Sequence, residues 1–159
     1  MSSPRATEWG EGMVPEELYI DYKHQLQRMD GVDEVPEQDI VIWLKEMQSD
    51  PYITYRLTYD PDDKEAAGFI IVSFPPECDP DCDIFIQDLY VRPESRRKGL
   101  ATELVKKTLN MYKAKDPCLF VMDKNITAQR FWDKIFKRMP DRQDYWPGGK
   151  LRVYNKKEK

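Results

Sequence analysis

The sequence predicts an α/β (α+β) fold in which helices flank a central sheet. Two observations favour this class. Apolar residues recur every three or four positions in four segments, and short stretches rich in β-branched and aromatic residues lie between them. A chain of 159 residues is long enough to bury about 70% of its unfolded surface in one core. Because no repeat or long linker divides the chain, we expect one domain over residues 1–159.

The first half of the chain is expected to hold two helices and three strands. Residues 1–14 carry no periodicity and several Gly and Pro, which predicts an irregular N-terminus. Leu18, Tyr22 and Leu26 are then spaced as on one face of a helix. Further on, an alternating stretch, a turn rich in Pro and Asp, and an apolar stretch predict a hairpin. The expected elements are helices at 16–29 and 36–48 and strands at 52–59, 66–74 and 84–91.

The second half is dominated by helical periodicity. A stripe of apolar residues that begins at Ala101 has the spacing 3, 1, 3, 1, 3, and a second stripe with the same spacing begins at Ala128. Between them, Pro117 opens a short apolar stretch that predicts a strand. The expected elements are a helix at 99–112, a strand at 118–122, a helix at 126–139 and a strand at 151–154.

The composition is that of a water-soluble globular protein, with 40% hydrophobic and 34% charged residues. The longest nearly apolar run, residues 66–72, is far shorter than the roughly 20 residues of a membrane span. The first residues also lack the apolar segment of a secretory signal. We therefore expect a cytoplasmic protein with no membrane partner.

The net charge of −4 conceals a division between the two halves of the chain. Up to Tyr90 there are 6 Lys and Arg against 21 Asp and Glu, whereas from Val91 onward there are 19 against 8. Such a division suggests two surfaces suited to partners of opposite sign, and two solvated faces are the alternative.

The three cysteines do not form an even set, and in a reducing compartment they are expected to remain thiols. Cys78 and Cys82 are the only close pair, for which a polar loop is favoured over a metal loop or a local disulfide. Zinc needs four convergent ligands, and the single histidine, His24, lies far upstream. No metal site is expected.

A strand that leads through a basic turn into a helix is the segment that carries chemistry. The strand expected at 84–91 is followed by Arg96, Arg97 and Lys98, and Gly99 precedes the expected helix. Backbone N–H groups at a helix N-terminus have no partners within the helix, and the helix dipole adds positive potential. Gly99 allows close approach because it has no Cβ. The segment is therefore a candidate phosphate site, although an exposed basic turn on a surface helix has the same composition.

This segment resembles the acetyl-CoA motif of the GNAT family, the Gcn5-related N-acetyltransferases. The motif is Gln/Arg-x-x-Gly-x-Gly/Ala, and Arg96, Gly99 and Ala101 fill its fixed positions. Val91, at the end of the preceding strand, and Pro93 precede the motif at the family's spacing. The placement between a strand and a helix makes the match more specific than six residues alone.

A second segment is similar to the family's next strand and helix. Asn125, Ala128 and Phe131 match the pattern Asn-x-x-Ala-x-x-Phe-Tyr, and Trp132 stands where the family commonly has Tyr. The two segments together span residues 84–138. The resemblance implies the GNAT acyltransferase fold, a central and mostly antiparallel mixed sheet with splayed middle strands and flanking helices.

The resemblance further implies that acetyl-CoA is the cosubstrate. Strand residues would offer backbone groups to the pantetheine and the thioester, with the N–H of Leu89 or Tyr90 as donor to the oxyanion. The basic turn would hold the pyrophosphate, and Asn125 would contact the pantetheine. The implied CoA-binding residues are Leu89, Tyr90, Val91, Arg96, Arg97, Lys98, Gly99, Leu100, Ala101, Thr102, Asn125 and Trp132.

The acid–base residues depart from the family pattern. Trp132 cannot replace the usual Tyr as an acid, because an indole N–H only donates a hydrogen bond. The stretch at Gln87 resembles a segment of diamine acetyltransferases in which a Glu acts as base, and Gln87 could only hold a water in place. Asp88 is the nearest carboxylate, but strand alternation directs its side chain to the other face, and a structural contact with a buried backbone group is an equal alternative for it. Tyr145, from the closing loop, is a candidate acid, although a structural role as an aromatic residue of a hairpin turn is slightly favoured. Proton transfer by water alone is the third option.

The expected function is transfer of an acetyl group from acetyl-CoA to a primary amine. A small polyamine-like or aminoglycoside-like cation is favoured, followed by a lysine side chain, because the acidic half would attract a cation. Two alternatives stay open: a catalytically inert CoA-binding module, and an acetyltransferase that acts on aminoacyl-tRNA. Nucleic acid is disfavoured as a partner, because exposed aromatic residues do not alternate with the basic ones. A homodimer also stays open.

Overall fold

A six-stranded mixed sheet forms the centre of the structure, a computed structural model that describes residues 14–74, 82–122, 124–146 and 149–156, of which 137–156 are described by their backbone alone. The strands are β1 (Ile53–Tyr59), β2 (Ala66–Ser73), β3 (Ile84–Val91), β4 (Pro117–Met122), β5 (Phe136–Trp146) and β6 (Gly149–Lys156). Their order in the sheet is β1-β2-β3-β4-β6-β5. The helices are α1 (Glu16–Asp30), α2 (Glu37–Gln48), α3 (Leu100–Met111) and α4 (Ile126–Ile135), with one 3₁₀ turn, η2 (Pro93–Ser95), before α3.

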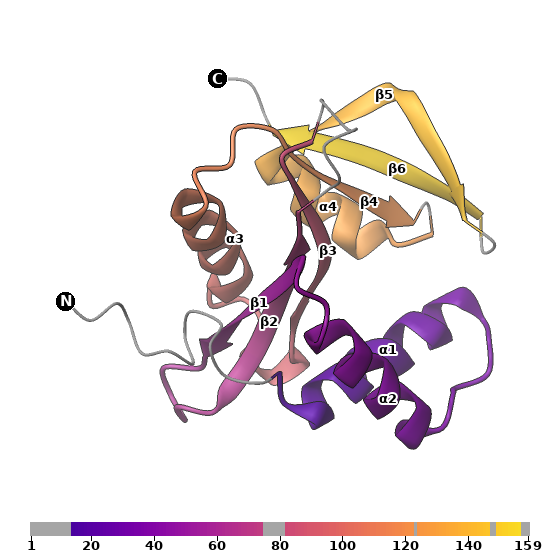
Figure 1. Ribbon diagram of the computed structural model, residues 1–159, viewed down its shortest axis with the longest axis vertical. Helices are drawn as coiled ribbons and strands as arrows, with labels where there is room; N and C mark the ends of the chain where they lie inside the picture. The colour runs from indigo at the N-terminus through magenta and orange to yellow at the C-terminus, as the bar shows by residue number, and fades with distance from the viewer. Residues whose placement is uncertain (1–13, 75–81, 123, 147–148, 157–159) are drawn as a thin grey trace.

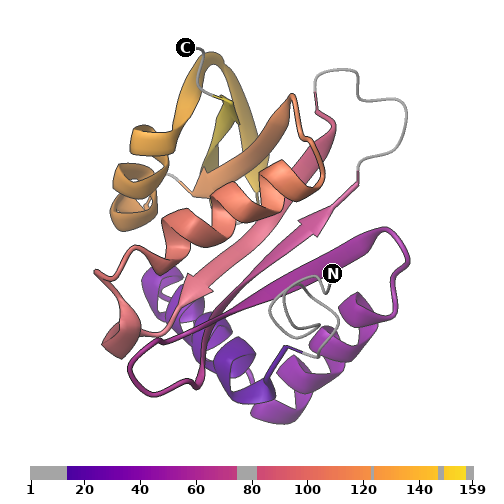
Figure 2. The same cartoon turned by 90° about the vertical axis from the view of Figure 1, so that its left-hand side faces the viewer.

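Helices cover both faces of the sheet, with α1 and α2 on one side and α3 and α4 on the other (Figure 1, Figure 2). In β2, Phe69 and Ile71 pack with side chains of α1 and α2, whereas Ile70 and Val72 pack with those of α3 and α4. All four are fully buried, as expected of a central strand that is apolar on both faces. None of the described helices is long and apolar enough to cross a membrane. The expected fold class is confirmed.

The prediction of a helix at 126–139 is wrong in its second part. The observed helix, α4, ends at Ile135, and Phe136 has an extended backbone and begins β5. Phe136 is 3% exposed, and its ring centroid lies 5.2 Å from that of Trp132. The helical spacing of these two residues therefore bridges a helix–strand junction. Pro140 disfavours helical backbone at the residue before it, which is the local signal that opposed a longer helix.

The two parallel strands at the centre of the sheet pair at one end alone. Residues 84–86 of β3 are paired with residues 117–119 of β4. From residue 118 to residue 122, β4 pairs with β6 on its other edge. β3 continues beside β2 as far as Val91. The splay that the GNAT resemblance implied thus lies between β3 and β4, beyond Ile86 and Leu119.

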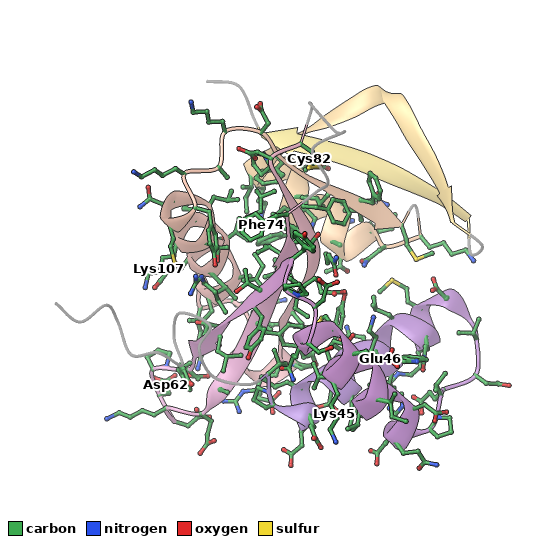
Figure 3. All side chains as sticks on the ribbon, viewed as in Figure 1. Lys45, Glu46, Asp62, Phe74, Cys82 and Lys107 are labelled. Atoms are coloured by element: carbon green, nitrogen blue, oxygen red, sulfur yellow. A yellow bond between two sulfur atoms is a disulfide. The ribbon has the colours of Figure 1, made fainter. Side chains whose placement is uncertain are left out.

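A disulfide joins the paired end of β3 and β4. Cys82 and Cys118 are bonded, with their Cα atoms 5.8 Å apart (Figure 3). The expectation of free thiols is therefore wrong for these two residues, and Cys78 lies outside the described residues. The sequence singled out Cys78 and Cys82 because they are close in the chain. The bridge instead spans 36 residues and depends on the strand register.

Reduction of this disulfide should lower the free energy of unfolding by about 4 kcal/mol, because the bridge closes a loop of 36 residues in the unfolded chain. Urea unfolding with and without dithiothreitol measures the difference. The double variant Cys82→Ser, Cys118→Ser should unfold near the midpoint of the reduced protein and should not respond to dithiothreitol. Equal midpoints for oxidised and reduced protein would contradict a stabilising bridge.

Gly68 allows β2 and β3 to approach closely beside the splay, and Gly68→Ala should lower the free energy of unfolding by about 2 kcal/mol. A Cβ at this position would lie 2.3 Å from the carbonyl oxygen of Tyr90, a backbone atom that moves only with its strand. Gly68 is paired with Val91, so the strain would reach the last residues of β3. Urea unfolding tests the prediction, and a variant as stable as the wild type would refute it.

Candidate active site

A cavity of about 940 Å³ lies where β3 and β4 diverge. Its wall comes from α1, β3, the segment that leads into α3, β4 and α4. Among the residues that the sequence singled out, those that line it are Gln87, Asp88, Leu89, Tyr90, Val91, Arg96, Arg97, Gly99, Leu100, Ala101, Thr102, Asn125 and Trp132. Two do not fit this picture. Lys98 is directed elsewhere, and the side chain of Tyr145, in β5, lies outside the described part of the chain.

The backbone between β3 and α3 forms a loop suited to an anion. Arg97 and Gly99 have φ angles of 66° and 76°, in the left-handed region. Gly99 is the N-cap of α3, and a Cβ there would meet nothing within 4 Å, so the space above it is open. The N–H groups of the first turn of α3 therefore border the cavity at Leu100 and Ala101 without a side chain in front of them.

Arg96 is held in place by contacts within the protein. Its Nε donates to the carbonyl oxygen of Val91 at 2.7 Å, and its Nη2 donates to Oε1 of Gln25 at 3.2 Å. The guanidinium carbon also lies 5.6 Å from the centroid of the Tyr90 ring. The arginine of the sequence motif thus ties the loop to the end of β3 and to α1, while part of its exposed side chain borders the cavity.

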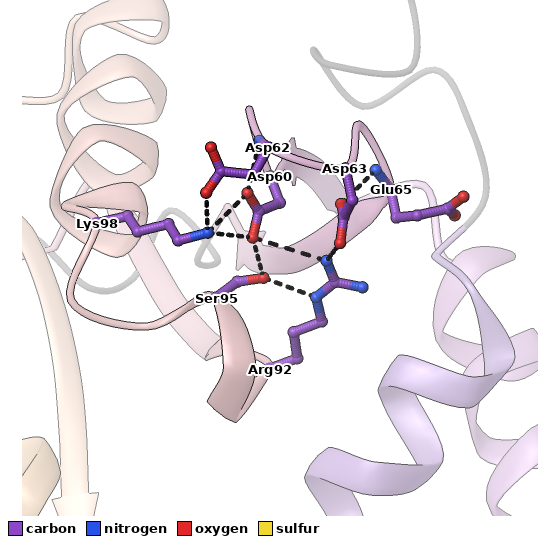
Figure 4. A network of polar contacts seen from close by, with 7 residues as sticks. All are labelled: Asp60, Asp62, Asp63, Glu65, Arg92, Ser95 and Lys98. Atoms are coloured by element: carbon purple, nitrogen blue, oxygen red, sulfur yellow. Dashed lines mark hydrogen bonds and ion pairs between the residues drawn. The ribbon is translucent and has the colours of Figure 1, made fainter.

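Lys98, one of the expected CoA-binding residues, is paired with two aspartates in this structure. Its Nζ lies 2.8 Å from Oδ2 of Asp60 and 2.6 Å from Oδ2 of Asp62, at the turn between β1 and β2 (Figure 4). The hydrogen bond from Lys98 is the largest of the effects that hold the pKa of Asp60 well below its usual range. The stabilisation is therefore present above the ordinary aspartate pKa of about 4, and it is lost as the pH falls through the lowered value.

A bulge in β3 changes the direction of Asp88. Ile71 is paired with Asp88 and Val72 with Ile86, which leaves Gln87 as an extra residue. Ile86 packs with the cluster below α3 and α4, whereas Asp88 contacts α1, on the other face. Strand alternation alone would have put these two residues on the same face. Gln87 and Asp88 both line the cavity, which is walled by residues from both faces of the sheet.

Asp88 is paired with a buried tyrosine. The hydroxyl of Tyr22, in α1, donates to Oδ1 of Asp88. Burial, and then the charge of Asp88, raise the pKa of Tyr22 well above its usual value. Tyr22 therefore stays protonated at neutral pH and remains a donor to the carboxylate. Its ring packs between Phe69 and Tyr90, with centroids 5.5 Å from each, so its position is fixed.

The α4 residues of the second motif have structural partners. The side-chain oxygen of Asn125 accepts a hydrogen bond from the N–H of Ala128 at 3.0 Å and so caps α4. Trp132 is 5% exposed and packs against Phe131 at a centroid distance of 4.9 Å. The position of the family's usual Tyr is therefore filled by a core side chain that also borders the cavity.

The sequence did not single out the α1 wall of the cavity as a site. Tyr22, Gln25, Leu26 and Met29 line it, and they carry no charge. Their helical spacing was visible, but the same spacing predicts core packing equally well. A tyrosine in the middle of such a stripe was the available signal, because a buried hydroxyl needs a partner. In the described part of the chain, no group of acidic, Cys or His side chains could hold a metal ion.

This architecture is that of an acyl-CoA-dependent N-acyltransferase: diverging central strands, a cavity between them, and an anion loop at the N-terminus of the following helix. Residues 16–136 match the acetyltransferase (GNAT) family. The chain therefore belongs to the GNAT family, and acetyl-CoA is its cosubstrate. A search among curated proteins finds no match.

Several solved structures share the fold. An acetyltransferase from Thermus thermophilus superposes with a TM-score of 0.67 at 16% identity, over 89% of each chain. NAA60 from Arabidopsis thaliana, in complex with a bisubstrate analogue, gives 0.59 at 13% identity, over 92% of this chain and 96% of that one. PaiA N-acetyltransferase from Thermoplasma acidophilum, in complex with coenzyme A, gives 0.55 at 17% identity, over 90% and 92%.

Proposed function

We propose that the protein acetylates a primary amine, that of a small cation or of a lysine side chain, which binds with its nitrogen beside Asp88. The observation that carries this proposal is the bulge at Gln87. It turns the carboxylate of Asp88 into the wall of the same cavity that is bordered by the anion loop at Gly99. A negative group for the amine and a positive end for the cosubstrate thus belong to one continuous space.

The proposed position of the cosubstrate follows the cavity wall. The pyrophosphate would lie against the N–H groups of Leu100 and Ala101, where a side chain at Gly99 would intrude. The pantetheine would run along β3 past Val91, and the thioester would lie near Leu89 and Tyr90, one of which would donate its N–H to the oxyanion. Because the side-chain oxygen of Asn125 caps α4, a contact with the pantetheine falls to its amide NH₂ group.

The proposed reaction is direct transfer. The amine nitrogen attacks the carbonyl carbon, a C–N bond forms, and the C–S bond breaks to release the CoA thiolate. Asp88 would hold the ammonium group by its charge and accept one proton from it, directly or through a water held by Gln87, which leaves the neutral amine that attacks. The second proton, lost from the nitrogen as the amide forms, would pass to water. A thiolate is a good leaving group, and its protonation would fall to water or to Tyr145 of β5. Tyr22 acts as a positioning residue through its bond to Asp88.

A small acceptor with one ammonium group near an apolar portion fits the described wall. Leu26 and Met29 of α1 and Phe120 of β4 line the cavity together with Asp88. Polyamines and aminoglycosides can present such a group, and so can a lysine side chain. The strongly acidic character of the first half does not extend to the α1 wall, where the lining residues are neutral.

The test of this proposal is thiol release from acetyl-CoA with a panel of acceptors at equal concentration. The panel contains polyamines, aminoglycosides, monoamines with an apolar substituent, lysine peptides and aminoacyl-tRNA. Turnover with one of the small amines or with the lysine peptides is expected, and mass spectrometry should show one added acetyl group. CoA binding without turnover across the panel would instead indicate an inert binding module. Turnover with aminoacyl-tRNA alone, sensitive to salt, would indicate the nucleic-acid alternative.

A cytoplasmic location is part of the proposal, because acetyl-CoA is consumed in the reaction. In that compartment the bridge between Cys82 and Cys118 would be exposed to reducing conditions. Fractionation of cells that produce the tagged full chain tests the location, and recovery outside the cytoplasm would overturn it.

A further inference from the structure

A buried carboxylate lies beside the anion loop and is not among the residues that line the cavity. Asp60 directly follows β1, and its side chain is 3% exposed. It contacts Ser95, the last residue of η2, and Lys98 beyond it, both from a distant part of the chain (Figure 4). We call this cluster the Asp60 network. Its members are Asp60, Asp62, Asp63, Arg92, Ser95 and Lys98.

The network holds the loop at its entry. Ser95 is fully buried, and its hydroxyl donates to Oδ2 of Asp60 at 2.5 Å. Arg92 donates from Nε to the same hydroxyl at 2.7 Å and from Nη2 to Oδ2 of Asp63 at 2.5 Å. Arg92 is also bound through its backbone, because its N–H donates to the carbonyl oxygen of Ala67 at 2.8 Å. The chain is therefore fixed where it leaves β3.

The network also holds the loop at its exit. Lys98 donates to both carboxylate oxygens of Asp60, at 2.9 Å and 2.8 Å. The next residue, Gly99, has the left-handed backbone that opens α3 and borders the cavity. Local backbone hydrogen bonds order the first part of the loop, where the N–H of Ser95 donates to Arg92 and that of Arg96 donates to Pro93. Asp60 adds a tie to its last part, at Lys98, from another part of the sheet.

From this geometry we infer that Asp60 is a positioning residue for acetyl-CoA: through Ser95 and Lys98 it holds the anion loop in the conformation that receives the pyrophosphate. The inference rests on the proposed position of the pyrophosphate at Gly99. It assigns Lys98 the role of a strut between the loop and the sheet, and not that of a phosphate ligand. A loop that is already ordered binds acetyl-CoA more tightly, because no conformational entropy of the loop is lost on binding.

The variant Asp60→Asn distinguishes a strut from a phosphate ligand at Lys98, because the two roles predict opposite changes in the affinity for CoA. Without the negative charge of Asp60, the ammonium of Lys98 would keep only its ion pair with the exposed Asp62, at 2.6 Å, and would be freer to reach a phosphate. If Lys98 were a phosphate ligand, CoA would bind as tightly as before or more tightly. If Lys98 is a strut, the loop loses its order and the KM for acetyl-CoA rises, by about tenfold, while kcat stays the same.

The experiment compares Asp60→Asn, Lys98→Met and their double variant. Each single variant should raise the KM for acetyl-CoA about tenfold, and the double variant should raise it by less than the product of the two effects, because both changes break the pair between Lys98 and Asp60. The matched control is Lys107→Met. Lys107 forms an ion pair with Glu103 on the exposed side of α3, at 2.6 Å. Its substitution therefore removes one positive charge, as Lys98→Met does, at a position outside the loop. The control should keep the wild-type KM.

A truncated thioester provides a readout that a general loss of stability would not give. S-acetylpantetheine lacks the pyrophosphate, so its KM should be equal in wild type and variants. Unfolding midpoints show that each variant is folded at the assay temperature, and Lys98→Met, whose side chain is 31% exposed, covers the case in which Asp60→Asn does not fold. Wild-type binding by Asp60→Asn, additive effects in the double variant, or an equal loss with S-acetylpantetheine would each overturn the inference.

The proposed function and this inference fail in different ways. If wild-type protein does not bind CoA, or if Gly99→Glu binds CoA as well as the wild type does, the pyrophosphate lies elsewhere and the proposed site is wrong. If Gly99→Glu abolishes binding while Asp60→Asn and Lys98→Met bind normally, the proposed site stands and the positioning role of Asp60 is refuted.

Discussion

Asp88→Asn should lower kcat about a thousandfold and leave the KM for acetyl-CoA nearly unchanged. The amide keeps an oxygen that can accept the hydrogen bond from Tyr22, so the contact between β3 and α1 survives. It loses the negative charge that would hold the ammonium group and the capacity to accept its proton. Steady-state rates of thiol release, with acetyl-CoA and the acceptor varied in turn, measure both parameters.

The control for this prediction is Tyr22→Phe, which keeps the ring among Phe69 and Tyr90 and removes only the donor to Asp88. A positioning role predicts a smaller loss, about tenfold in kcat, because the carboxylate is still present. Asp88→Asn should also unfold near the wild-type midpoint. A large drop in stability with little change in kcat would show instead that Asp88 is a structural partner of Tyr22.

Gly99→Glu should raise the Kd for CoA by about a thousandfold, because the new carboxylate would occupy the space proposed for the pyrophosphate and repel it. A Cβ at Gly99 meets no protein atom within 4 Å, so the substitution does not clash with the fold. Its structural cost is the left-handed backbone, about 1 kcal/mol for a residue with a side chain. Isothermal titration calorimetry with CoA gives the affinity, and urea unfolding gives the stability.

Gly31→Glu is the matched control. Gly31 ends α1 with a φ of 72°, close to the 76° of Gly99, and a Cβ there also meets nothing within 4 Å. The backbone strain should therefore be similar at the two positions, while Gly31 does not line the cavity. Loss of CoA binding in both variants would mean that the backbone strain is responsible. Retained binding in both would show that the pyrophosphate does not bind at Gly99.

The sequence predicted those parts of the fold and site that depend on local spacing. The strand at 84–91, the turn at Gly99 and the helix after it are consecutive in the chain, and their chemistry could be inferred without knowledge of the fold. The role of Lys98 could not be inferred, because its partner Asp60 lies 38 residues away and enters only through the sheet. The same holds for the bond between Cys82 and Cys118, which depends on the register of β3 and β4.

The direction of Asp88 was beyond local analysis for a different reason. Alternation in a strand is counted residue by residue, and a bulge is recognised only when the partner strand is known. The end of α4 was missed because Phe136 satisfies helical spacing from within β5. In both cases a side chain takes its place from tertiary packing that overrides the local period.

The bulge at Gln87 also decides toward which face of the sheet each later side chain of β3 points. Before it, even-numbered residues face the helices α3 and α4, as Ile84 and Ile86 do; after it, the even-numbered Tyr90 packs with the α1 and α2 side. Deletion of Gln87 would make Ile86 and Asp88 consecutive, and ordinary strand alternation would then keep both sets on their present faces. Gln87 is thus extra to the pairing of β3 with β2, so its deletion should preserve the direction of Asp88. Straightening of the strand with Gln87 retained would instead turn Asp88 to the face of Ile86.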